Sequence, residues 1–160
     1  MRIEIHPKNP QARLLADVVR TLQSGGLICY PTDSTYAYGW LAGQKAAQER
    51  VQRLRKLSDR HLYAIACANL RQASEYGKID NAAFAVLKKL TPGPYTFILP
   101  ANAALPKRLM DEKRRTIGIR IPDNAIVQAL LAELGEPMMT SSLTLPSDVE
   151  PYYRDRKSVV

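Results

Sequence analysis

The chain has 160 residues, of which 46% are hydrophobic, and 23 Lys and Arg residues against 15 Asp and Glu residues give it a net charge of +8. A chain of this size is expected to form one globular domain that buries roughly 70% of its unfolded surface, without metals or disulfides to stabilise it. No apolar run approaches the ~20 residues of a membrane-spanning helix, and the dense periodic apolar positions exclude a disordered chain. Cys29 and Cys67 lie in apolar runs and the start of the chain has no apolar signal segment, so we expect reduced thiols in a cytoplasmic protein.

The apolar periodicity predicts alternating strands and helices. After a short strand at 3–5, Asn9 and Pro10 have the pattern of an N-cap and first helical residue, and Gly25-Gly26 ends that helix. A buried strand at 27–30 then opens into a polar loop at 32–36. The later expected elements are a helix over 44–56, a strand over 62–67, a helix over 81–90, strands over 95–99 and 116–121, a helix over 125–134 and a strand over 138–142. This order predicts a single α/β domain with a twisted, mixed sheet flanked by helices.

The sequence contains none of the standard catalytic and phosphate-binding motifs. The eight glycines form neither G-x-x-x-x-G-K-[ST] nor G-x-G-x-x-G, and no G-x-S-x-G accompanies the serines. His6, His61, Cys29 and Cys67 lack the spacing of metal ligands, so we predict no structural metal.

The positive charge is concentrated in two windows. Twelve of the 23 basic residues lie in 45–60 and 107–120. Arg50, Arg53, Lys56 and Arg60 recur at helical spacing, which is typical of a surface that binds phosphates. The predicted RNA-binding residues are Arg50, Arg53, Lys56, Arg60, Lys113, Arg114 and Arg115. The alternative is a solvated helix face followed by a basic loop.

Four polar groups of residues lie at strand ends or in loops: 31–36, Arg55-Lys56 with His61, 118–122, and 140–142. Hydroxyls and guanidinium groups together suit an anionic substrate in a cleft. The alternatives are that the Ser and Thr residues form caps or turns, and that Arg120 is a paired arginine in the core.

Taken in order, the motifs Gly26–Gly39, Arg53–Leu57, Thr91–Phe97, Gly118–Pro122 and Pro137–Ser142 resemble the YrdC/YciO family, from about Asn9 to Leu145 and nearer to its YciO branch. The resemblance implies a YrdC-like sheet around a concave basic cavity that binds ATP and double-stranded RNA. The best understood members are threonylcarbamoyl-AMP synthases, which join threonine, bicarbonate and ATP, release pyrophosphate and serve tRNA modification.

The resemblance also implies site residues. Thr32 and Thr35 belong to the loop that holds threonine, Arg55 stands at a phosphate-binding lysine, and residues 140–142 replace Ser-Thr-Ser. The expected substrate and nucleotide site comprises Thr32, Thr35, Arg55, His61, Arg120, Thr140, Ser141 and Ser142. A carbamate attacking the α-phosphate of ATP brings two anions together, which calls for cations, fixed donors and Mg²⁺ bound with the ATP.

The chain departs from the synthase pattern at three positions. Leu57 replaces an ATP-binding arginine, His61 replaces a lysine, and Thr144 replaces an asparagine. We therefore predict a protein that binds nucleotide (ATP or AMP) and double-stranded RNA or tRNA with weak or lost synthase chemistry. The alternatives are an active synthase that uses threonine and bicarbonate, and a nucleotide-sensing interaction module, in each case without a membrane partner. We expect the domain to span 1–146, followed by a tail at 147–160 that is truncated or poorly ordered.

Overall fold

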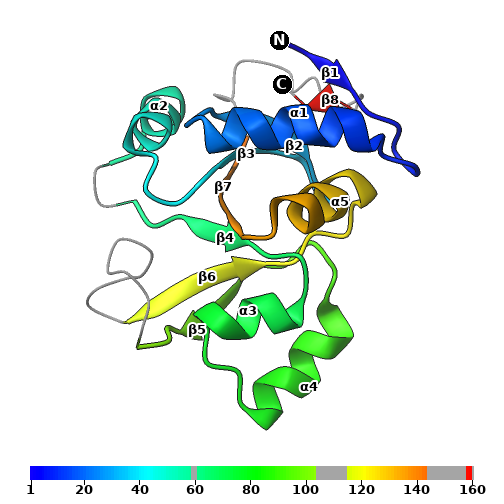
Figure 1. The fold of residues 1–160 in the computed structure, drawn as a ribbon. Helices are drawn as coiled ribbons and strands as arrows, with labels where there is room; N and C mark the ends of the chain where they lie inside the picture. Colours follow the sequence, from blue (N-terminus) through cyan, green and yellow to red (C-terminus); the bar gives the residue numbers. More distant parts are fainter. Residues whose placement is uncertain (59–60, 104–114, 144–157, 160) are drawn as a thin grey trace.

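The computed structural model of the chain describes residues 1–58, 61–103, 115–143 and 158–159 (Figure 1). The strands are β1 (Ile3–Glu4), β2 (Ile28–Pro31), β3 (Tyr36–Trp40), β4 (Ala64–Ala66), β5 (Phe97–Pro100), β6 (Thr116–Arg120), β7 (Met138–Ser142) and β8 (Ser158–Val159). The helices are α1 (Ala12–Gln23), α2 (Lys45–Arg55), α3 (Leu70–Tyr76), α4 (Asn81–Leu90) and α5 (Ala125–Leu134).

Six strands form one mixed sheet in the order β2-β3-β7-β4-β6-β5, and β1 pairs with β8 in a separate two-stranded sheet. In the larger sheet β4 and β6 run parallel, and the other four neighbouring pairs are antiparallel. The predicted single α/β domain with a mixed sheet is therefore confirmed.

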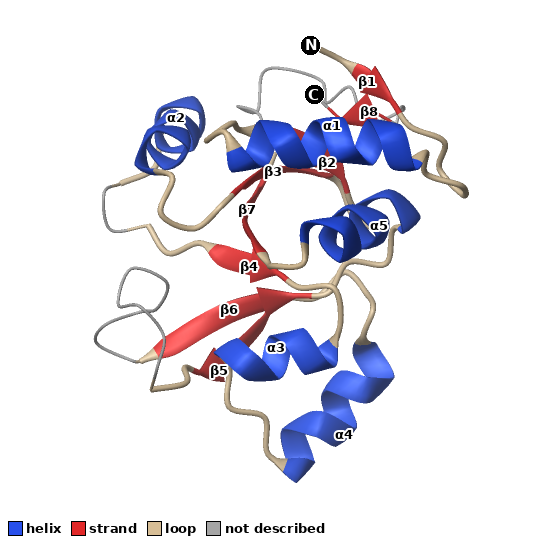
Figure 2. Ribbon diagram, viewed as in Figure 1, coloured by secondary structure: helices blue, strands red, loops and turns tan. Residues whose placement is uncertain are grey.

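Each face of the sheet carries its own core. On one face α1 and α5 pack over β2 and the start of β7, with Leu22, Leu130 and Met138 fully buried. On the other face α2, α3 and α4 contribute to a second core that includes Trp40 and Ile65. In Figure 2 the β4–β6 pair passes between α5 on one side and α3 and α4 on the other. Alternation of side chains along the strands produces this division, because successive residues point to opposite faces.

The predicted helices at 81–90 and 125–134 are confirmed residue by residue, and side chains cap both. The Asp80 carboxylate accepts a hydrogen bond from the amide of Ala83 (2.8 Å), and the Asn124 side chain accepts one from the amide of Ile126 (3.0 Å). Gly135 ends α5 with φ +74°, a left-handed conformation that glycine adopts without steric cost.

The predicted start of the first helix was wrong. The N-cap residue is Gln11, and the amide of Asn9 donates instead to His6 Nδ1 (3.0 Å). A turn centred on His6 thus occupies the residues that the Asn-Pro pattern assigned to the helix.

Three elements were missed. Strand β3 begins within the segment expected to be a polar loop, and α3 follows β4 where no helix was predicted. Strand β8 lies within 147–160, where only a truncated or poorly ordered tail was expected, and it pairs with β1. Helix α3 has only seven residues and depends on the Asn69 cap and on burial of Ala73. Such a short helix is stabilised by packing rather than by its own sequence.

The described part of the chain contains no helix long and apolar enough to cross a membrane. Both cysteines are free. Burial raises the pKa of Cys29 to about 11 and that of Cys67 to about 12, so both thiols stay protonated at neutral pH.

Candidate anion-binding site

Strand β7 distributes the three predicted hydroxyl residues over both faces of the sheet. Thr140 lies on the α1–α5 face, where its hydroxyl is 2.7 Å from the Tyr30 hydroxyl. Ser141 lies on the opposite face, where its Oγ accepts a hydrogen bond from Arg55 Nη1 (2.6 Å). Ser142 pairs with Ala37 and shares the face of Thr140. The residues expected to form one polar group therefore belong to two different environments.

The Thr32 hydroxyl forms hydrogen bonds within the turn between β2 and β3. Thr32 is buried, and its Oγ1 accepts hydrogen bonds from the amides of Ser34 (3.2 Å) and Thr35 (3.1 Å) and donates to the Thr35 carbonyl. The Thr35 hydroxyl donates to the Tyr36 carbonyl (2.8 Å). This is the turn-forming role that the sequence left open as an alternative.

Arg120 forms a buried ion pair. Its Nη2 lies 3.4 Å from Asp33 Oδ1 and 3.2 Å from Ser34 Oγ, and the side chains of Arg120 and Asp33 are each 10% exposed. The second oxygen of Asp33 accepts a hydrogen bond from the amide of Asp123 (2.8 Å). Arg120 Nε is buried and has no hydrogen-bond partner among the described residues.

The twist of the sheet explains how this pair forms between β2 and β6, although β3, β7 and β4 lie between them. The two strands end at opposite ends of the sheet, and twist accumulated over the intervening strands turns these ends toward the same face. The same face holds Tyr30, whose pKa burial raises to about 12, although Thr140 and Arg120 oppose the shift.

Arg55 lies at the end of α2 on the opposite face. Its guanidinium is half-buried, forms no ion pair with a described residue, and has a buried Nε without a hydrogen-bond partner in that part of the chain. Two further buried donors there lack described partners, Trp40 Nε1 and the Tyr63 hydroxyl, and the rings of these residues are 5.0 Å apart. A ligand rich in acceptor oxygens would satisfy such donors.

His61 lies beside this group, with its ring 4.8 Å from that of Tyr63. Partial burial, and secondly the positive charge of Arg55, lower the pKa of His61 below 6.5. His61 is therefore neutral at pH 7 and supplies no charge where the resemblance implies a lysine. Leu57 is half-buried and supplies none either.

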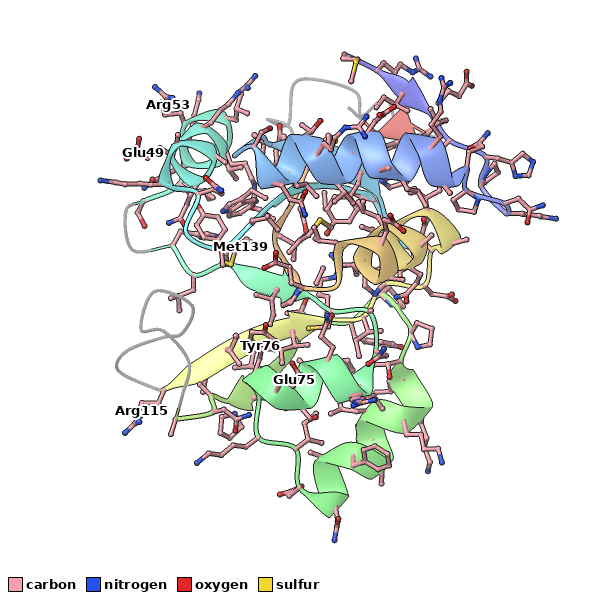
Figure 3. The ribbon with its side chains drawn as sticks, in the orientation of Figure 1. Glu49, Arg53, Glu75, Tyr76, Arg115 and Met139 are labelled. Carbon is pink, nitrogen blue, oxygen red and sulfur yellow. The ribbon has the colours of Figure 1, made fainter. Side chains whose placement is uncertain are left out.

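The predicted RNA-binding residues are only partly described. Arg50, Arg53 and Lys56 are exposed, and Lys56 has φ +52° and ends α2, so the basic row leaves the helix there. Figure 3 shows Arg53 on the outer side of α2 and Arg115 at the start of β6. Arg60, Lys113 and Arg114 lie outside the described residues, as does Thr144.

The structure thus joins Arg55 to Ser141 and Arg120 to the 32–35 turn, but it places these two groups on opposite faces of the sheet. Asp33 and Tyr63 were not selected from the sequence. A signal for Asp33 was present, since a buried arginine in an apolar strand requires an anionic partner. Among the described residues no three His, Cys, Asp or Glu side chains are grouped as metal ligands.

Comparison with known proteins identifies the family. Residues 20–159 match the family model of Sua5, YciO and YrdC, described as "Telomere recombination". The chain belongs to this family. Over 142 residues it is 51% identical to Escherichia coli YciO, an uncharacterized protein, and this covers 89% of the chain and 69% of YciO. The crystal structure of E. coli YciO superposes with a TM-score of 0.83.

More distant members of the Sua5/YciO/YrdC family have an assigned activity. The threonylcarbamoyl-AMP synthase of Vibrio vulnificus is 31% identical over 140 residues, covering 85% of this chain and 74% of the synthase. The crystal structure of Pyrococcus abyssi Sua5 complexed with L-threonine has a TM-score of 0.74 at 22% identity, covering 84% of this chain and 39% of that one, and it supports the fold. The chain is therefore more similar to YciO than to the synthase.

Proposed function

We propose that this chain is a YciO-type protein that binds ATP or AMP and double-stranded RNA or tRNA, and in which threonylcarbamoyl-AMP synthase chemistry is weak or lost. The proposal rests on the unpaired charge of Arg55, on the pairing of Arg120 with Asp33 and on the exposed basic residues of α2. It goes beyond family membership, because the YciO relative has no assigned activity.

The unpaired guanidinium of Arg55 carries the nucleotide part of the proposal. It is partly desolvated, it is fixed by Ser141, and no described carboxylate neutralises it. A phosphate oxygen accepting from Nε and Nη would complete its hydrogen bonds in a bidentate arrangement that suits arginine.

The charge of the remaining site supports weak catalysis. The Asp33 carboxylate already neutralises Arg120, and Leu57 and His61 carry no positive charge at pH 7. Each missing charge-assisted contact is worth about 1.5–3 kcal/mol. Two such contacts correspond to a rate lower by about 10²-fold or more when carbamate and triphosphate must be held together.

The RNA part of the proposal rests on α2 and its end, where Arg50, Arg53 and Lys56 are exposed and form no ion pair with a described residue. Within the same helix, Glu49 is paired with Lys45 (3.8 Å). Binding through these cations would release counterions from the duplex, so its affinity would fall steeply with salt.

Three assays on one preparation test the proposal. We expect calorimetric ATP binding that Arg55→Ala abolishes and Arg13→Ala, at an exposed site on α1, leaves intact. We expect salt-sensitive binding to duplex RNA and only trace pyrophosphate release dependent on threonine and bicarbonate. The absence of both ATP and RNA binding in the folded protein would refute it.

An active threonylcarbamoyl-AMP synthase is the second candidate, and the 31% identity to the V. vulnificus synthase over 85% of the chain favours it. The same pyrophosphate assay separates the two. Turnover at a typical enzyme rate, of the order of 1–10³ per second, would establish the synthase and reject the loss of chemistry.

A further inference from the structure

A groove lies away from the Arg55 group, outside the carboxyl ends of β4 and β6. These two strands are parallel neighbours, with Ala66 opposite Arg120 in the last pair. Helix α3 follows β4 and packs on the Trp40 face, whereas α5 follows β6 and packs on the Leu22 face. Figure 2 shows the two helices on opposite sides of the strand pair. Ligands of open α/β sheets bind where neighbouring chain crossovers diverge in this way, because a crevice opens between them.

The groove has a volume of about 420 Å³, within the range of sites for small molecules. Its lining residues are Ala68, Asn69, Leu70, Arg71, Lys88, Thr91, Pro92, Ile121 and Gln128. Buried Ile121 and half-buried Leu70 give it an apolar floor.

One wall is held in place by the chain itself. The amide of Gly93 donates to the carbonyl of Ile121 (2.9 Å), which fixes the loop after α4 against the end of β6. A Cβ at residue 93 would lie 2.6 Å from the carbonyl oxygen of Leu90, so the turn after α4 requires glycine at this position. The groove is therefore formed before a ligand binds.

The charged residues that line the groove are all positive. Arg71 on α3 and Lys88 on α4 are exposed, and neither pairs with a described carboxylate. No Asp or Glu is among the lining residues. Asn69 Oδ1 accepts a hydrogen bond from the Gln72 amide, and Gln128 Nε2 donates one to the Pro122 carbonyl. The Asn69 side-chain NH₂ and the Gln128 side-chain oxygen are therefore left to bind a ligand.

We propose that this groove is a second ligand site, which binds a small phosphate monoester with an apolar or planar body. Arg71 and Lys88 approach from different helices, which suits the several oxygens and the double charge of a phosphate better than one carboxylate. Ile121 and Leu70 contact the body of the ligand. Ser141, which contacts Arg55, lies near the other end of these strands. Strand β7 runs antiparallel to β4, and Thr140 pairs with Ala64, the first residue of β4. The site is thus independent of the proposed nucleotide site at Arg55.

The test uses phenyl phosphate as the probe in an amide NMR titration of the full chain. We expect shifts at the amides of Ala68, Ile121 and Gln128 that persist in Arg55→Ala, with inorganic phosphate binding more weakly because it makes no apolar contact. Arg71→Glu with Lys88→Glu should raise the dissociation constant at least tenfold.

The matched control is Lys8→Glu with Arg13→Glu, which changes the net charge equally at exposed positions outside the groove and away from α3 and α4. It should leave the dissociation constant within about twofold, since salt screens distant surface charges. Equal weakening by both double variants, or millimolar phenyl phosphate shifting no groove amide in the folded protein, would overturn the proposal. Equal affinity for inorganic phosphate would overturn the apolar part of it.

Discussion

Removing one partner of the Arg120–Asp33 pair should destabilise the protein substantially. Both side chains are 10% exposed, so Arg120→Met leaves a buried carboxylate whose remaining donor among the described residues is the Asp123 amide. Asp33→Asn leaves a buried guanidinium with Ser34. Breaking a buried pair costs about 3–5 kcal/mol, and the 3.4 Å separation places our expectation near the lower end, at about 3 kcal/mol. With a urea slope of roughly 2 kcal/mol per molar, the unfolding midpoint should fall by about 1.5 M.

The double variant Arg120→Met with Asp33→Asn should recover most of that loss, because no uncompensated charge stays buried. The surface pair Arg20–Asp17 in α1 provides the matched control, with side chains 72% and 33% exposed. Arg20→Met should cost less than about 1 kcal/mol. If Arg120→Met costs no more than Arg20→Met, the pair is solvated in solution and Arg120 is free to bind substrate.

Three further predictions address the site. Leu57→Arg with His61→Lys should raise threonine- and bicarbonate-dependent pyrophosphate release by about 10²-fold, and an unchanged rate in a folded, ATP-binding variant would show that these positions do not limit catalysis. Arg55→Ala should raise the pKa of His61 in an NMR titration but leave it below 6.5, since burial is the larger cause of the lowered pKa. In the wild type, His61 should make the free energy of unfolding rise with pH between its lowered pKa and 6.5, because the unfolded chain binds more protons in that range. Arg53→Glu with Lys56→Glu should weaken all RNA duplexes alike and flatten the log-log salt dependence by roughly 0.9 per lost phosphate contact, and a wild-type affinity that is insensitive to salt would refute phosphate-driven binding.

The fold could be predicted from the sequence where local signals are complete. Helix α5 combines an Asn124 cap, five buried apolar residues and a left-handed Gly135, and its limits were predicted correctly. Strand β3 could not be predicted, because it lies between β2 and β7 and is covered on both faces, so partners distant in the sequence define it.

The site was predictable by residue type but not by arrangement. The sequence indicated that Arg55, Arg120 and the hydroxyls of 140–142 belong together, but assignment to a face depends on the register of β7. A shift of one residue would exchange the faces of Thr140 and Ser141. The Asp33 pair also depends on twist accumulated over several strands, which no local pattern records.

The alternation along β7 separates the polar contacts of two adjacent residues. The Thr140 hydroxyl contacts Tyr30 on one face of the sheet, and the Ser141 hydroxyl contacts Arg55 on the other. A substitution at either residue therefore changes the polar contacts of one face and leaves those of the other face in place.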